Sequence, residues 1–259
     1  MEYLKQKIRR GDTLHGCWVN MGSSLSAEII GKSGFDWVLI DLEHGVGNEK
    51  DAFHQLQALS STGCTPMVRI GEVSRYRAQQ MLDMGAEGLM FPQIKSLEEA
   101  KLAAASMRYG PKGVRGVATM IRVTDFGASV EAYQKGVADR LLGIIQIETL
   151  ESLEILHEIA AIDGVDILFI GPADLSMSLG VFKQFDHPTY QAAIKKTAKI
   201  ALDHGKAAGV LMSDPAQYKM YYDMGFRFIA CGADSSFVRK GASTMASEMN
   251  DYRIKYRQP

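Results

Sequence analysis

The sequence has few of the features that mark several classes of protein. Its three cysteines, Cys17, Cys64 and Cys231, are odd in number and widely spaced, which argues against a disulfide framework or a zinc site and indicates reduced thiols. No apolar run approaches the ~20 residues of a membrane span. The N-terminal segment MEYLKQKIRRGD has no apolar signal core. We therefore expect a cytoplasmic protein that does not interact with a membrane.

An excess of charge is also absent. Lys and Arg number 29 against 30 Asp and Glu, which gives a formal net charge of −1, and no stretch gathers basic residues. We therefore expect no nucleic-acid partner. No G-x-G-x-x-G turn follows the first expected strand, which argues against a dinucleotide-binding fold.

The sequence does contain a regular alternation of short apolar runs with amphipathic helical segments. The runs expected to form strands are residues 14–20, 35–43, 66–70, 88–94, 144–147, 167–170, 208–212 and 226–231. This alternation is typical of a parallel α/β domain. Eight units in 259 residues match the roughly 250 residues of a TIM (β/α)8 barrel. We therefore predict one barrel domain over residues 1–259, in preference to an open doubly wound sheet or two small domains.

Three other segments stand out along the chain. Residues 1–9 carry apolar residues at helical spacing and are expected to close the bottom of the barrel. A long excursion over residues 95–140 separates the fourth and fifth strands, and long insertions often form lids or pocket walls. A final helix is expected from about residue 237 toward residue 253, with Phe237, Val238, Met245 and Met249 along it.

Polar residues gather where the expected strands end. They are Asp41, Glu43, His44, Arg69, Gln146, Glu148, Asp174 and Asp234. The carboxyl ends of barrel strands share one face, where barrel enzymes have their active sites. Glu148 and Asp174 would converge there and offer hard oxygen ligands for Mg²⁺ or Mn²⁺. The alternative is a pair of solvated loop acids.

Several of these segments together carry a family resemblance. The strings FDWVLIDLEHG, PMVRI, LDMGAEGLMFPQIKSLEEA, YGPKGVRGVA, IIQIET and FIGPADLSMSLG resemble the HpcH/HpaI aldolases of the phosphoenolpyruvate/pyruvate barrel superfamily. The resemblance implies a class II aldolase that cleaves a 4-hydroxy-2-oxo acid into pyruvate and an aldehyde. Such acids include 2,4-dihydroxyhept-2-enedioate and 2-keto-3-deoxy sugar acids. It also implies a divalent metal, Mg²⁺, Mn²⁺ or Co²⁺, and no organic cofactor.

The resemblance assigns roles at the later strands. Glu148 of Q-I-E-T and Asp174 of G-P-A-D match the metal ligands. Gln146 matches a glutamine beside the site. The backbone amides of Ala173 and Asp174 match those that hold the substrate carboxylate.

The resemblance also assigns roles at the earlier strands. Arg69 matches the arginine that stabilises oxyanion charge, and His44 matches the histidine that accepts the proton of the C4 hydroxyl. These tasks suit a fixed guanidinium and an imidazole. Asp83 of L-D-x-G matches the acid that pairs with His44, and Asp41 matches an acid near the metal waters. A Schiff-base mechanism would need a lysine on a strand, and the nearest candidate, Lys95, lies just past the fourth strand.

Two other functions remain as alternatives: a citrate-lyase β-like acyl-CoA lyase, and a non-catalytic barrel that binds a sugar phosphate at GADSS, residues 232–236. The choice of aldehyde is expected to depend on YGPKGVRG and on Arg122 and Asp125. There Arg115 or Arg122 either holds a distal carboxylate or lies on the surface.

The final helix bears on assembly. In the family such a helix packs on a neighbouring subunit, so the resemblance implies a homo-oligomer, a hexamer built as a trimer of dimers. The alternative is a helix folded back on its own barrel.

Overall fold

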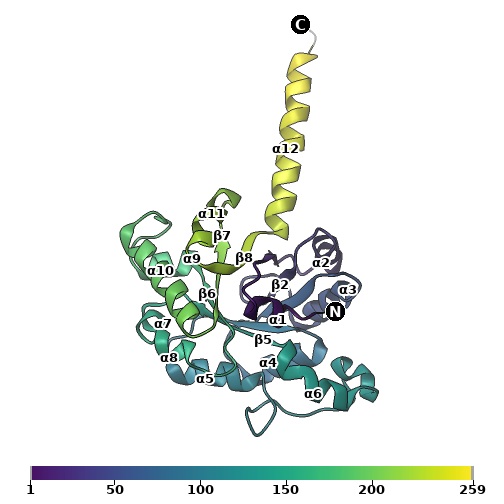
Figure 1. Ribbon diagram of the computed structural model, residues 1–259. Coiled ribbons are helices and arrows are strands. Elements are labelled where there is room, and N and C mark those ends of the chain that lie inside the picture. The colour runs from purple at the N-terminus through teal and green to yellow at the C-terminus, as the bar shows by residue number, and fades with distance from the viewer. Residues whose placement is uncertain (1, 258–259) are drawn as a thin grey trace.

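The computed structural model, which describes residues 2–257, contains a closed barrel of parallel strands in sequence order (Figure 1). The strands are β1 (Leu14–Val19), β2 (Trp37–Asp41), β3 (Thr65–Arg69), β4 (Gly88–Phe91), β5 (Leu142–Ile147), β6 (Ile167–Ile170), β7 (Ala207–Met212) and β8 (Phe226–Ala233). Strand β8 pairs with β1 and closes the barrel. The predicted TIM (β/α)8 barrel is therefore confirmed.

Helices surround the strands and connect them. They are α1 (Leu4–Arg9), α2 (Ser24–Gly31), α3 (Glu49–Leu59), α4 (Arg75–Met84), α5 (Leu97–Ser106), α6 (Val130–Arg140), α7 (Leu150–Glu154), α8 (Leu156–Ala160), α9 (Pro172–Ser178), α10 (Pro188–Asp203), α11 (Tyr218–Asp223) and α12 (Asp234–Lys255), with 3₁₀ turns η1 (Arg122–Gly127) and η2 (Pro215–Gln217). Local sequence fixes several helix starts. In α5, for example, the Ser96 side chain accepts from the Glu99 amide while Glu99 accepts from the Ser96 amide, which satisfies amides at the helix end.

Large apolar side chains fill the inside of the barrel. The rings of Trp37 and Phe228 stack with their centroids 4.0 Å apart, and Trp18 packs on Phe169 at 5.5 Å. A Cβ at Gly16 would lie 2.2 Å from the Trp37 ring, so only glycine leaves room for the indole there. Leu4 and Ile8 of α1 belong to the same buried cluster, and α1 closes the bottom of the barrel as expected. The barrel is thus a packed core that holds its rim rigidly.

The excursion between β4 and β5 lies at the amino-terminal end of the barrel. Arg122 donates to the carbonyl oxygens of Met84 (2.7 Å) and Leu56 (3.5 Å), near the ends of α4 and α3, which lead into the next strands. Arg108 lies against Gly164, just before β6. The expectation that this segment shapes the substrate side is therefore wrong for the chain's own site. Arg115 is buried, so it is not a surface charge.

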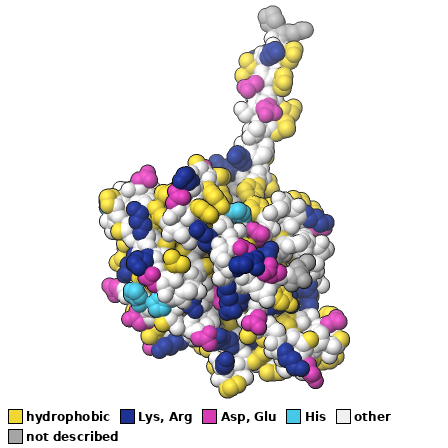
Figure 2. Space-filling view, viewed as in Figure 1, with side chains coloured by type: hydrophobic (Ala, Val, Ile, Leu, Met, Phe, Trp, Pro, Cys, Tyr) yellow, Lys and Arg dark blue, Asp and Glu magenta, His cyan; other side chains and the backbone are white. Residues whose placement is uncertain are grey.

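Helix α12 projects away from the barrel (Figure 1). Asp234 is its one buried residue within the described part of the chain, and the rest of the helix carries exposed apolar side chains (Figure 2). These are Phe237, Val238, Met245, Met249, Tyr252 and Ile254, and the exposed Tyr256 directly follows the helix. The alternative of a helix folded back on its own barrel is wrong. The helix also begins three residues before the expected residue 237.

The three cysteines are free thiols, as expected from their spacing. Between residues 2 and 257, no helix combines the length and the apolar content needed to cross a membrane.

Candidate active site

The carboxylate of Glu148, directly after β5, is held at both oxygens. The backbone N–H and the side-chain amide of Gln93 donate to Oε1 at 2.7 and 3.3 Å, and the amide of Gln146 donates to Oε2 at 2.9 Å. Glu148 is 1% exposed. Burial raises its pKa from 4.5 to about 7; the nearby charges of Asp174 and Glu43 act in the same direction, against the Gln93 amide and Arg69. A cation beside this buried carboxylate would stabilise its ionised form.

Asp174 lies in the first turn of α9, beside Glu148. Its side chain is exposed and makes no hydrogen bond or ion pair with any residue from 2 to 257. The charge of Asp174 acts on Glu148 and raises its pKa. Gly171, which precedes α9, leaves room for the Glu148 carboxylate, because a Cβ there would lie 2.1 Å from Glu148 Oε2. The first-turn amides of a helix lack acceptors within the helix, so the amides of Ala173 and Asp174 are available to an anion.

Arg69, at the end of β3, forms the other half of the site. Its Nε and NH2 groups donate to the two oxygens of Asp41 at 3.0 and 2.7 Å, and NH1 donates to Gln146 Oε1 at 3.4 Å. The guanidinium carbon lies 5.8 Å from the Trp18 ring centroid. Burial acts to lower the pKa of Arg69, but the hydrogen bonds that it donates to Asp41 and the surrounding carboxylates raise it overall. The guanidinium is therefore a fixed positive charge under the rim.

Glu43 and His44 follow β2 in a turn that Asp41 organises. Asp41 Oδ1 accepts from the amides of both residues, at 3.0 and 3.2 Å. Glu43 forms an ion pair with Arg69 at 2.9 Å, and its pKa is raised, chiefly by burial. The His44 side chain is 69% exposed, with Nε2 3.9 Å from Glu43 Oε2. The imidazole is thus open to a substrate placed over Arg69.

The carboxylates of the site suit a divalent cation whose remaining coordination positions are filled by other ligands. In the described part of the chain, no group of three or more His, Cys, Asp or Glu residues encloses a metal site. Mg²⁺ commonly binds one or two carboxylates and keeps its other positions for water or substrate oxygens. Glu148, with its raised pKa, and the free Asp174 are donors of this kind.

Asp83 does not lie with these residues. Its carboxylate accepts from Arg115 NH2 at 2.7 Å, and it belongs to the last turn of α4, toward the amino-terminal end of the barrel. The expected pairing of Asp83 with His44 is therefore not formed within the chain. The carboxylate that His44 meets is that of Glu43.

Sequence reasoning missed Gln93. This residue has a positive φ of 54°, which is unusual for a side chain other than glycine, and its backbone N–H points at Glu148 because of it. No sequence pattern marks a glutamine that adopts this conformation. Its role arises from the geometry of the turn after β4.

The GADSS segment is organised around the carboxylate of Asp234. Asp234 Oδ1 accepts from the Asn20 and Ser235 amides at 2.9 Å each, and Oδ2 accepts from the Ser26 hydroxyl at 2.7 Å. This carboxylate is buried. It fixes the start of α12 to the loop after β1.

Comparisons with known proteins find one family that matches nearly the whole chain. A family model described as HpcH/HpaI aldolase/citrate lyase matches residues 14–241. The hydroxypyruvate/pyruvate aldolase of Roseobacter denitrificans is 38% identical over 245 residues, which is 94% of this chain and 95% of that protein. The 4-hydroxy-2-oxo-heptane-1,7-dioate aldolase of Salmonella dublin is 36% identical, with coverage of 94% and 92%. The crystal structure of an HpcH/HpaI aldolase/citrate lyase family protein from Burkholderia cenocepacia superposes with a TM-score of 0.90 at 33% identity, over 95% of this chain and 98% of that one.

Proposed function

Because the chain belongs to the HpcH/HpaI aldolase/citrate lyase family, we propose that it cleaves a 4-hydroxy-2-oxo acid reversibly into pyruvate and an aldehyde at the rim built around Glu148. Relatives that match 94% of the chain are aldolases, so the protein is a carbon–carbon lyase of the aldolase type. Their names have a 2-oxo acid in common, and the proposal centres on that part of the substrate. Because these relatives are aldolases, the alternative of an acyl-CoA lyase is disfavoured.

The observation that carries the proposal is the pair of carboxylates that follow neighbouring strands, Glu148 directly after β5 and Asp174 in the first turn of α9 after β6. Glu148 and Asp174 are the residues that would hold a divalent cation, and Mg²⁺ or Mn²⁺ suits such oxygen donors. When bound, the cation supplies Lewis-acid polarisation of the 2-oxo group and balances charge on its oxygen. The strands of the barrel, β1 to β8, contain no lysine, which argues against a Schiff base.

The chain's own groups would bind the 2-oxo acid end of the substrate. The free amide N–H groups of Ala173 and Asp174 would donate hydrogen bonds to the substrate carboxylate. Gln146 and Asp41 hold the Arg69 guanidinium in place, so that it faces the 2-oxo oxygen without rearranging. A charge that is positioned before reaction stabilises the transition state more than the ground state.

His44 would take the proton in the cleavage step. The C4 hydroxyl loses its proton to the imidazole as the C3–C4 bond breaks, and C4 leaves as the aldehyde carbon. The electron pair of that bond passes to C3, and protonation of C3 then gives the methyl group of pyruvate. Glu43, between Arg69 and His44, takes the orienting place that was expected for Asp83.

The test is pyruvate release, measured with lactate dehydrogenase and NADH over several 4-hydroxy-2-oxo acids, including 4-hydroxy-2-oxo-heptane-1,7-dioate. We expect EDTA to abolish turnover, Mg²⁺ or Mn²⁺ to restore it, and Glu148→Gln to remain inactive with added metal. Treatment of the enzyme with borohydride in the presence of pyruvate should leave the mass of the chain unchanged. A covalent adduct, or full turnover in EDTA, would contradict the proposal.

We also propose that α12 packs on another copy of the chain. Val238, Met245, Met249, Tyr252 and Tyr256 recur at helical spacing, and all are exposed. Monomeric proteins rarely leave an apolar stripe of this kind in water. A homo-oligomer covers the stripe, and the expected hexamer built as a trimer of dimers is one such assembly.

Light scattering after size exclusion tests this assembly. Met249→Asp places a charge in the stripe and should lower the assembled mass, because a buried unpaired carboxylate is costly. Ser247→Asp adds the same charge about 160° away around the helix, on the basis of 3.6 residues per turn, and should leave the mass unchanged. A wild-type chain that elutes as a monomer would refute the proposal.

A further inference from the structure

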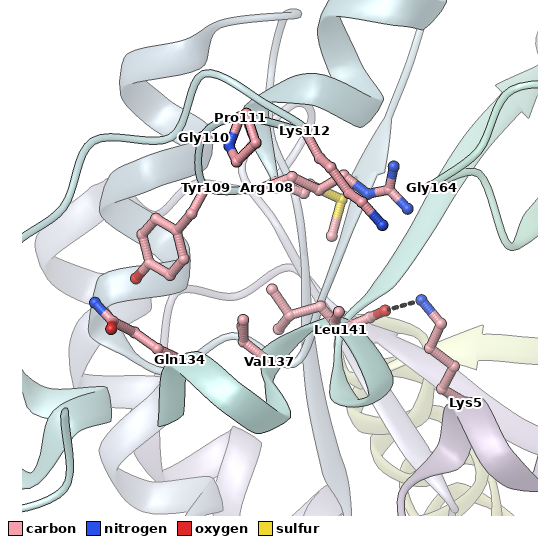
Figure 3. Close-up of a pocket in the computed structure, with 12 residues that line it drawn as sticks. Lys5, Arg108, Tyr109, Gly110, Pro111, Lys112, Gln134, Val137, Leu141 and Gly164 are labelled. Atoms are coloured by element: carbon pink, nitrogen blue, oxygen red, sulfur yellow. Dashed lines mark hydrogen bonds between the residues drawn. The ribbon is translucent and has the colours of Figure 1, made fainter. Parts of the chain in front are cut away.

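A pocket of about 280 Å³ lies at the amino-terminal end of the barrel (Figure 3). Its floor comes from the end of α6 and from Leu141, which immediately precedes β5. Its roof is the segment over residues 107–112 that follows α5, and Lys5 of α1 stands at one end. The amino ends of barrel strands face away from the catalytic rim, so this pocket is separate from the site around Glu148.

The two ends of the pocket differ in chemistry. Figure 3 shows Arg108 and Lys112 reaching toward the end where Lys5 lies, with Tyr109 and Gln134 at the other end. Apolar side chains form the walls between them, namely Met107, Pro111, Val137 and Leu141. Burial raises the pKa of Tyr109 to about 12, so its hydroxyl stays protonated at neutral pH.

The charged end has one cation that is free to bind. Lys5 Nζ donates to Asp166 at 3.0 Å, and Arg108 donates to both oxygens of Asp163 at 2.9 and 2.8 Å. Lys112 makes no hydrogen bond or ion pair within residues 2–257. Three cations line the pocket. The carboxylates of Asp163 and Asp166 are not among the lining residues and are held by Arg108 and Lys5, so the cation available to an entering anion is Lys112.

The roof of the pocket is held in place by the excursion. The Arg115 guanidinium stacks on the Tyr109 ring at 4.6 Å, donates to Asp83 at 2.7 Å and donates to the Tyr133 hydroxyl at 3.1 Å. At Gly113 a Cβ would lie 2.3 Å from the carbonyl oxygen of Arg108, so the turn packs tightly on itself. A pocket that exists before the ligand arrives loses little conformational entropy on binding.

We propose that this pocket binds a small amphipathic carboxylate, with its carboxylate at Lys112 and its apolar body between Met107, Val137 and Leu141. The volume is near the lower end of the roughly 300–1,000 Å³ of small-molecule sites, which suits one ring or a short alkyl chain. A single uncommitted ammonium matches one negative charge better than the two of a phosphate ester. The apolar walls distinguish such a ligand from an inorganic anion.

Calorimetric titration of the full chain with 4-phenylbutyrate tests the proposal. The titration contains Mg²⁺ and saturating pyruvate, so that the probe cannot bind at the catalytic rim. We expect one saturable site per chain. The neutral amide of the same acid should bind at least tenfold more weakly, which corresponds to about 1.4 kcal/mol.

Two variants locate the binding site. Lys112→Glu should weaken 4-phenylbutyrate at least tenfold, and Ala138→Trp should block it by filling the pocket from α6. Lys101→Glu reverses the charge of an exposed lysine of α5 outside the pocket and should leave the affinity unchanged. Thermal melting confirms that each variant is folded. Absence of saturable binding at millimolar 4-phenylbutyrate, or equal affinity in wild type and Lys112→Glu, overturns the proposal.

Discussion

Gly171→Ala tests whether the position of the Glu148 carboxylate controls the chemistry. The backbone at Gly171 has φ −88° and ψ 95°, which any residue adopts, so the substitution introduces no backbone strain. The added Cβ, however, would lie 2.1 Å from Glu148 Oε2, 3.1 Å from Gln146 Nε2 and 3.2 Å from Glu148 Cβ. The perturbation is therefore steric and is directed at the carboxylate.

The size of the effect follows from this distance. An ordinary contact needs roughly 3.5 Å, so the oxygen has to move by about 1 Å or more. Metal–ligand distances tolerate about 0.2 Å. A misplacement of about 1 Å near the reacting groups lowers rates on the order of 10²-fold. We expect kcat/KM to fall about 10²-fold and Mn²⁺ affinity to fall about tenfold or more.

The assays are the pyruvate-coupled reaction and calorimetric titration with Mn²⁺. Gly136→Ala is the matched control, because Gly136 lies within α6 with no atom within 4 Å of its added Cβ. That control should keep full activity and gain up to about 1 kcal/mol of helix stability. A Gly171→Ala protein that is folded and binds Mn²⁺ as tightly as wild type would refute the reasoning.

Three further predictions concern the same network. Arg69→Met leaves the buried Asp41 without its partner, so kcat/KM should fall about 10²–10³-fold and the unfolding free energy in urea by about 3–5 kcal/mol; unchanged stability would contradict the pairing. Because the pKa of Glu148 is raised from 4.5 to about 7, the folded state keeps a proton that the unfolded chain releases, and the unfolding free energy in EDTA should fall by roughly 3 kcal/mol from pH 4.5 to 7 and then level off. The same urea titrations of Glu148→Gln should lack this slope. Gln93→Pro removes the N–H that donates to Glu148 and also forces φ from 54° to about −65°, so it should weaken Mn²⁺ binding about tenfold or more by calorimetry, whereas Gln93→Gly suits the φ of 54° and should stay within a few-fold of wild type.

The strands were the most predictable part of the fold. The run over residues 167–170 matches β6 at both ends, because four buried apolar residues between turn signals admit few other structures. Strand ends also predicted the neighbourhood of Asp41, Arg69, Gln146 and Glu148, since parallel strands direct their carboxyl ends to one rim.

The prediction that the excursion over residues 95–140 lines the substrate side was wrong for a physical reason. Its helix α5 follows β4 directly, so the rest of the excursion comes after a helix and before a strand. In a barrel such segments lie at the amino-terminal end. The same reasoning applies to Asp83, one residue before the end of α4. The order of elements along the chain therefore decides which residues reach the rim, and a match of sequence strings does not report it.

The role of Gln93 could not have been predicted from the sequence pattern. Its contribution depends on a positive φ after β4 and on the position of the Glu148 side chain, 55 residues later. Hydrophobic periodicity reports which face of an element is buried. It does not report the direction of a single N–H group in a turn.

The packed interior of the barrel has a consequence for the two ends of the molecule. Trp18, Trp37, Phe169 and Phe228 leave no channel, so neither solvent nor a small molecule passes from one end to the other. Strand β5, however, connects the two ends: Leu141, at the floor of the lower pocket, immediately precedes it, and Glu148 at the rim immediately follows it, a span of about 23 Å at 3.3 Å per residue. A shift of Leu141 along the axis of β5 would therefore be a shift of the backbone that carries the Glu148 carboxylate.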